Sequence, residues 1–181
     1  MVNALPTATI TPSGSTTICA GSSLTLTAPA GAAYVWSNGA STQSIAVTSA
    51  GSYTVTVNAN GCTATSTPTV VTVNALPTAT ITAAGSTTLC QGSSVVLTAS
   101  PATSYLWSTG ATSASITVAN AGNYSVALTT NGCSATSAVT TVNVTPLPTP
   151  SVSVIGATTF CQGGSVTLTA SNAGAYLWSN G

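Results

Sequence analysis

The sequence predicts an all-β protein made of tandem antiparallel β-sandwiches. Three observations lead to this prediction: apolar and polar residues alternate with a period of two, turn-forming residues fall between the alternating runs, and the whole pattern recurs along the chain. β-Branched residues are abundant, which suits strands, and no stretch carries the periodicity of a helix. Six or seven short strands per unit are typical of a small sandwich.

A repeat of 71 residues divides the chain without any insertion or deletion. Its boundaries fall at short Pro-containing segments, residues 2–6, 73–77 and 144–148. We therefore expect one repeat at residues 1–75, a second at 76–146 and the first half of a third, truncated, at 147–181. The short linkers favour stiff stacking. The repeat aligns Cys19 with Cys90 and Cys161, Cys62 with Cys133, Tyr34 with Tyr105 and Tyr176, Trp36 with Trp107 and Trp178, and Tyr53 with Tyr124.

The predicted strands of the first repeat follow the alternating residues in order. They are centred on residues 8–10, 24–26, 34–36, 45–47, 53–57 and 71–73. Two dipeptides between strand runs, Asn38-Gly39 and Asn60-Gly61, have the residues of a two-residue type I′ hairpin, because Asn and Gly tolerate positive φ. Thr109-Gly110 is a weaker version in the second repeat.

The aromatic side chains share strand faces with aliphatic ones, so we expect them in the core and not on a carbohydrate-stacking platform. A Trp on the third strand and a Gly-x-Tyr opening a late strand are typical of an immunoglobulin-like sandwich. The expected core aromatics are Tyr34, Trp36, Tyr53, Tyr105, Trp107, Tyr124, Tyr176 and Trp178.

The chain contains no Lys, Arg, Asp, Glu or His, whereas ordinary domains carry about a quarter charged residues. General acid–base catalysis and nucleophile activation need such groups, so we expect no enzyme and no catalytic residue. Carboxylate metal sites and phosphate binding need them too, which argues against metal, cofactor and nucleic-acid binding. The apolar runs are only a few residues long, so we expect no membrane insertion within the segment.

Four strings carry a resemblance to a known repeat family: Cys90-Gln91-Gly92-Ser93-Ser94-Val95, Tyr105-Leu106-Trp107-Ser108, Ala121-Gly122-Asn123-Tyr124 and Asn131-Gly132-Cys133-Ser134. They resemble the Ig-like and PKD-like repeats of very large Bacteroidetes surface proteins, including the gliding-motility adhesins. The resemblance covers the whole chain. It implies a secreted array, exported by the type IX route to the bacterial cell surface, that serves adhesion or motility. PKD domains often carry an acidic Gly-Asp-Gly loop, but this chain has Ser37-Asn38-Gly39 there, so no carboxylate function carries over.

The function expected from these observations is structural. The chain would be a rigid spacer or fibre shaft of a surface adhesin, with neighbouring repeats as partners and with lateral or head-to-tail self-association. The alternative is a self-assembling extracellular filament, in which strands from a neighbouring subunit complete the half repeat. An ice-binding Thr face is a weaker alternative, because Thr is ordinary on solvent-facing strands.

The five cysteines, Cys19, Cys62, Cys90, Cys133 and Cys161, are candidate structural disulfides, since a secreted chain without His or another base offers little to a catalytic or metal-binding thiol. Pairing within each repeat would join Cys19 to Cys62 and Cys90 to Cys133. The expected topology places those partners at opposite ends of a sandwich, about 30 Å apart, whereas a disulfide needs Cα atoms within about 7 Å. Pairing of Cys19 with Cys133 across the junction is therefore favoured, with pairing within repeats and free thiols left open.

Overall fold

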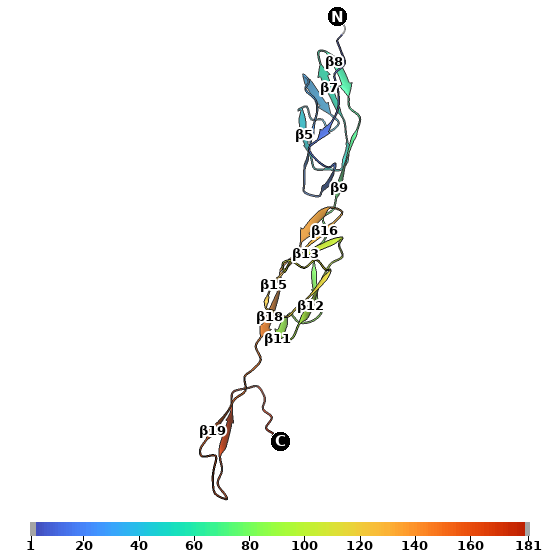
Figure 1. Ribbon diagram of the computed structural model, residues 1–181. Coiled ribbons are helices and arrows are strands. Elements are labelled where there is room, and N and C mark those ends of the chain that lie inside the picture. The colour runs from blue at the N-terminus through green and yellow to red at the C-terminus, as the bar shows by residue number, and fades with distance from the viewer. Residues whose placement is uncertain (1–2, 180–181) are drawn as a thin grey trace.

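The computed structural model describes residues 3–179, and all of its regular elements are strands. Two small sandwiches follow one another end to end, and a two-stranded ribbon lies beyond the second (Figure 1). Each sandwich has its own apolar core, one built from residues of the first repeat and one from the second. The all-β, immunoglobulin-like class predicted from the sequence is confirmed.

The first sandwich contains nine strands in two layers. One layer is the antiparallel sheet β1-β3-β5. The other consists of two ladders, β2-β9-β6 and β4-β7-β8. The strands are β1 (Thr11–Pro12), β2 (Thr17–Cys19), β3 (Leu24–Thr27), β4 (Ala33–Trp36), β5 (Ser44–Val47), β6 (Gly51–Tyr53), β7 (Val55–Ala59), β8 (Cys62–Thr65) and β9 (Thr69–Asn74).

The second layer is divided because two of its long strands are interrupted at the same level. Between β6 and β7 the chain breaks at Thr54, and between β8 and β9 it breaks around Ser66. Ser66 is buried, and its hydroxyl accepts the Val55 N–H at 3.1 Å while its own N–H donates to the Val55 carbonyl at 2.9 Å. This side chain satisfies a backbone donor that the interrupted ladder leaves free. The two interruptions divide two long strands into four short ones, so nine strands are found where six or seven were predicted.

The second repeat has the same topology at positions 71 residues further on. Ser137 repeats the contact of Ser66 by accepting the Val126 N–H at 3.1 Å. The strands are β10 (Ile81–Ala83), β11 (Thr88–Cys90), β12 (Val95–Ala99), β13 (Ser104–Trp107), β14 (Ser115–Val118), β15 (Gly122–Tyr124), β16 (Val126–Thr130), β17 (Cys133–Thr136) and β18 (Thr140–Thr145).

Aromatic side chains lie in or against both cores. Trp36 and Trp107 are buried, and each indole N–H donates to a backbone carbonyl, of Thr42 at 2.7 Å and of Ser113 at 2.8 Å respectively. The buried Tyr124 donates its hydroxyl to the carbonyl of Asn120, four residues upstream, at 2.9 Å. The half-buried Tyr53 donates in the same way to the carbonyl of Ser49 at 3.0 Å. This is the tyrosine corner of immunoglobulin-like domains. Tyr34 and Tyr105 are half-buried and pack against the cores.

The two predicted hairpins differ. Asn60 and Gly61 both have positive φ, 52° and 75°, and join β7 to β8 as expected for type I′. At Asn38-Gly39 only the glycine has positive φ, and its N–H donates to the Trp36 carbonyl at 2.9 Å. The loop is therefore a three-residue turn, Ser37 to Gly39, with glycine in the left-handed position. The same turn accommodates Thr109, because that position needs no positive φ.

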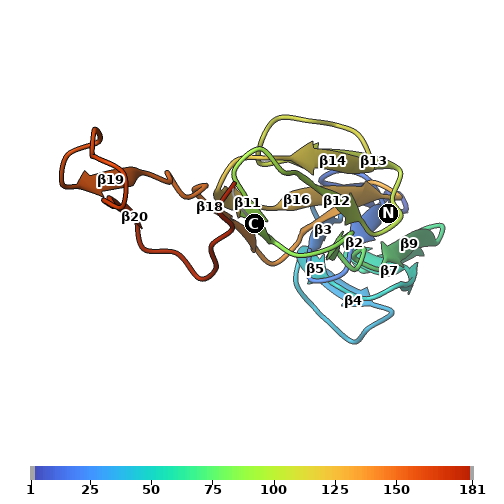
Figure 2. The ribbon, with the colours of Figure 1, turned by 90° about the horizontal axis from the view of Figure 1, so that it is seen from below.

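Residues 147–179 form only part of a third unit. β19 (Val152–Ile155) pairs with β20 (Thr167–Ala170) in the register that β10 and β12 have in the second repeat. This ribbon lies apart from both sandwiches (Figure 2). The prediction that Tyr176 and Trp178 belong to a core is wrong for this structure: they are 52% and 39% exposed, because no strand equivalent to β16 covers them within the described residues. With Pro148 and Pro150 they line an open hollow of about 540 Å³.

Candidate functional site

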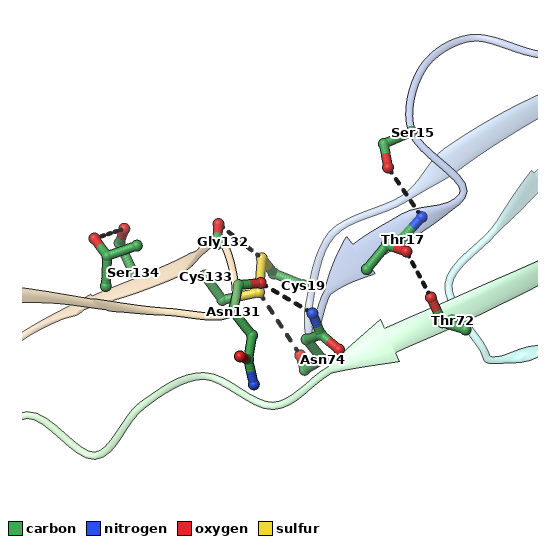
Figure 3. The surroundings of a disulfide bond; sticks show 10 residues. Ser15, Thr17, Cys19, Thr72, Asn74, Asn131, Gly132, Cys133 and Ser134 are labelled. Carbon is green, nitrogen blue, oxygen red and sulfur yellow. Dashed lines mark hydrogen bonds between the residues drawn. A yellow bond between two sulfur atoms is a disulfide. The ribbon is translucent and has the colours of Figure 1, made fainter. Parts of the chain in front are cut away.

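The junction between the two sandwiches is the candidate functional site. Among residues 3–179 there is no cluster of His, Cys, Asp or Glu that could hold a metal ion. At the junction, by contrast, side chains from three separate segments meet (Figure 3). These segments are the end of β2, the end of β9 and the hairpin between β16 and β17.

A disulfide bond joins Cys19 of the first repeat to Cys133 of the second, with a Cα–Cα distance of 5.6 Å and a sequence separation of 114 residues (Figure 3). The predicted pairing across the junction is therefore confirmed, and the pairings within repeats are not found. Cys133 is only 1% exposed. The bond is the one covalent link between the repeats, besides the linker, in the part of the chain that the structure describes.

The local fold explains why these two cysteines meet. β2 runs parallel to β9, with Cys19 opposite Asn74, so Cys19 lies where the chain leaves the first sandwich. The Ala20 N–H donates to the Asn74 carbonyl at 2.8 Å and extends this parallel ladder by one bond. On the other side, Asn131 and Gly132 have φ of 51° and 78°, and their tight turn places Cys133 first on β17.

Hydrogen bonding by Asn74 reinforces the disulfide. Its Nδ2 donates to the Asn131 carbonyl oxygen at 2.9 Å, which joins the last residue of β9 to the hairpin of the next repeat. The Sγ of Cys133 lies 4.0 Å from the Asn74 carbonyl oxygen, and the Sγ of Cys19 lies 3.8 Å from that of Gly132. Sequence reasoning treated Asn74 only as part of a linker. The available signal was Asn at the same place in two successive linkers, at Asn3 and Asn74.

The other three cysteines are unpaired in the described residues. Cys62 is half-buried and is the first residue of β8, the position that Cys133 has in β17. Cys90 is exposed and is the last residue of β11, the position that Cys19 has in β2. Cys161 is exposed in the partial third unit and is not part of a strand.

The sequence matches no family model and no curated protein. Two solved structures show a likeness to it. One is the mouse coronavirus receptor-binding domain complexed with its murine receptor, with 12% identity and a TM-score of 0.43 over 77% of this chain and 100% of that chain. The other is murine CEACAM1b, with 12% identity and a TM-score of 0.38 over 77% of this chain and 99% of that chain.

Residues 3–179 contain no helix with the length and apolar character needed to span a membrane.

Proposed function

We propose that this chain is a load-bearing spacer segment of an extracellular adhesin or fibre on a bacterial surface, of the gliding-motility type that its repeats resemble. The observation that carries the proposal is the Cys19–Cys133 bond across the junction. A ligand-binding module gains little from a covalent bond between successive domains, whereas a shaft gains resistance to extension. Disulfides persist in oxidising compartments, which supports an extracellular location.

The bond changes the path of a pulling force. Tension applied between the two ends of the chain passes from Cys19 directly to Cys133, so the residues between them stay unloaded. Those residues include β3 to β9 and β10 to β16, the greater part of both cores. The strands within this loop therefore remain shielded until the disulfide is reduced, whereas β1, β2, β17 and β18 lie outside it.

Single-molecule force spectroscopy on the full chain tests this function. Adding a reductant should release additional contour length of roughly 400 Å, the span of 114 residues at about 3.5 Å each. A Cys19→Ser, Cys133→Ser variant should show the full extension without reductant, and a Cys62→Ser variant should behave like the parent. Equal extension of the parent before and after reduction would exclude a load-bearing staple.

A self-assembling filament is the second candidate, and it is favoured by the exposed apolar side chains of the partial third unit. Val152, Val154, Ile155 and Leu168 are all largely exposed on the β19-β20 ribbon, together with Tyr176 and Trp178 nearby. Strands from a second subunit would cover them by strand addition. Electron microscopy separates the two candidates: long filaments formed by the purified chain favour assembly, and separate rods favour a covalent array.

A further inference from the structure

The unpaired Cys62 repeats the setting of the bonded Cys133. In the second repeat, Cys133 follows Asn131-Gly132 and lies 4.0 Å from the Asn74 carbonyl oxygen. In the first, Cys62 follows Asn60-Gly61 and its Sγ lies 3.9 Å from the carbonyl oxygen of Asn3. The hairpin side of the junction is thus present at Cys62, although Cys62 has no disulfide partner in the described residues.

The accompanying hydrogen bond is present as well. The Nδ2 of Asn3 donates to the Asn60 carbonyl oxygen at 2.8 Å, as Asn74 donates to Asn131 at 2.9 Å. The main difference between the two settings is burial: Cys133 is buried, whereas Cys62 is only half-buried. In the second repeat the additional cover includes Cys19 of the preceding repeat.

We propose that Cys62 forms a disulfide with the cysteine-bearing turn of another repeat of this kind. That repeat would lie against Asn3 and Cys62 in the way that the first repeat lies against Asn74 and Cys133. This inference rests on the proposed function and extends it. The partner would present its cysteine at the position relative to Asn3 that Cys19 has relative to Asn74, at the end of a parallel-paired strand such as β2. The exposed Cys90, paired opposite Thr145, presents the matching half at the other end of the second repeat.

The bond forms by thiol–disulfide exchange. The two thiols lose two protons and two electrons to the disulfide of an oxidised thiol oxidoreductase or of a small oxidant such as oxidised glutathione, which becomes a dithiol or two thiols. Successive staples would interleave, because Cys62 and Cys90 both lie between Cys19 and Cys133 in the chain. Tension would then run from Cys62 through β8 to β11 and leave at Cys90, so every repeat in the array would be protected from full extension.

Inserting a copy of residues 3–73 between Val2 and Asn3 of the full chain tests the site. The copy carries Thr17→Ser and Thr63→Ser, both at exposed positions, so that its Cys19 and Cys62 peptides differ in mass from the original ones. The inserted Cys19 then stands in the same relation to the downstream Cys62 as Cys19 has to Cys133. After folding with oxidised glutathione, peptide mapping without reduction should show the inserted Cys19 linked to the downstream Cys62, and that Cys62 should become resistant to alkylation. The original Cys19–Cys133 peptide serves as the internal standard for a correctly formed junction.

Two outcomes would overturn the proposal: a downstream Cys62 that is still alkylated, or a link between the inserted Cys19 and the Cys62 of its own copy. As a matched control, a downstream Cys62→Ser change should leave the inserted Cys19 alkylated while the Cys19–Cys133 link persists. The force experiment on the original chain depends on the Cys19–Cys133 bond and uses Cys62→Ser only as a control, so failure of this inference is distinguishable from failure of the spacer function.

Discussion

Asn74 and Asn131 lie 57 residues apart in the sequence, and a 2.9 Å hydrogen bond between them joins the end of one sandwich to the hairpin of the next. The bond ends beside the Cys19–Cys133 disulfide (Figure 3). The side-chain amide of Asn74 therefore holds the Asn131-Gly132 hairpin against the end of β9, next to the disulfide.

The Asn74→Ala variant should therefore lose part of the protection of the disulfide. Because the contact is exposed, its loss is worth about 0.5–1 kcal/mol, which corresponds to a roughly two- to fivefold faster reduction of the Cys19–Cys133 bond by dithiothreitol. The rate is measured by quenched alkylation and mass spectrometry. The Asn3→Ala variant removes the equivalent bond of the first repeat and should leave this rate unchanged; equal acceleration by both variants would contradict the assignment.

Replacing Thr130 with Ala should stabilise the second repeat. The Thr130 hydroxyl is buried without a hydrogen-bond partner, and the equivalent residue of the first repeat is Ala59. An unpaired buried hydroxyl costs on the order of 1 kcal/mol, so Thr130→Ala should raise the free energy of unfolding by about that amount. Urea denaturation measures the change. The reciprocal Ala59→Thr variant should be destabilised, and a loss of stability in Thr130→Ala would show that the hydroxyl has a partner.

Supplying the second half of a repeat should complete the third unit. A chain extended after Gly181 by a copy of residues 111–145 should fold Tyr176 and Trp178 into a core, because β16 and β18 provide the corresponding cover in the second repeat. Tryptophan fluorescence should shift to shorter wavelength, and the appended Cys133 should bond to Cys90. In a control with Val126→Asp in the appended copy, burial of that charge should prevent the shift. An unshifted spectrum of the extended chain would contradict the prediction.

Stability should be nearly independent of pH between about 3 and 8. The slope of the unfolding free energy with pH is set by the difference in bound protons between the unfolded and folded states. The chain has no Asp, Glu, His, Lys or Arg side chain, so the difference in protons bound by side chains is close to zero in that range. The slope is therefore close to zero, neither positive nor negative. Thermal melts of the oxidised protein, at low and high salt, check this. A shift of many degrees would disprove it.

Self-association should depend on the uncharged edge strands β4 and β13. Both lie at the edge of a three-stranded ladder, and they expose Val35 by 63% and Leu106 by 56% at equivalent positions. Edge strands without charges or covering segments tend to pair with other chains. We expect concentration-dependent light scattering that salt hardly alters. The Val35→Lys, Leu106→Lys double variant should reduce it, whereas a Val139→Lys control, outside both strands, should reduce it less.

Much of this architecture could be predicted from the sequence, because local patterns and the repeat determine it. The period-two alternation specifies strands, Asn60-Gly61 specifies a type I′ turn since both residues tolerate positive φ, and the 71-residue repeat specifies two like sandwiches. Even the Cys19–Cys133 pairing could be inferred, since the topology separates the cysteines of one repeat by the length of a sandwich.

Only the tertiary structure decided the contacts between segments that no local pattern links. The amide of Asn74 finds the Asn131 carbonyl, and the hydroxyl of Ser66 finds the Val55 N–H, because folding brings unsatisfied backbone groups within reach. Burial was likewise not a property of residue type. Trp107 and Trp178 occupy the same position of the repeat, yet one is buried and the other exposed, because an aromatic side chain becomes core only when opposing strands pack over it.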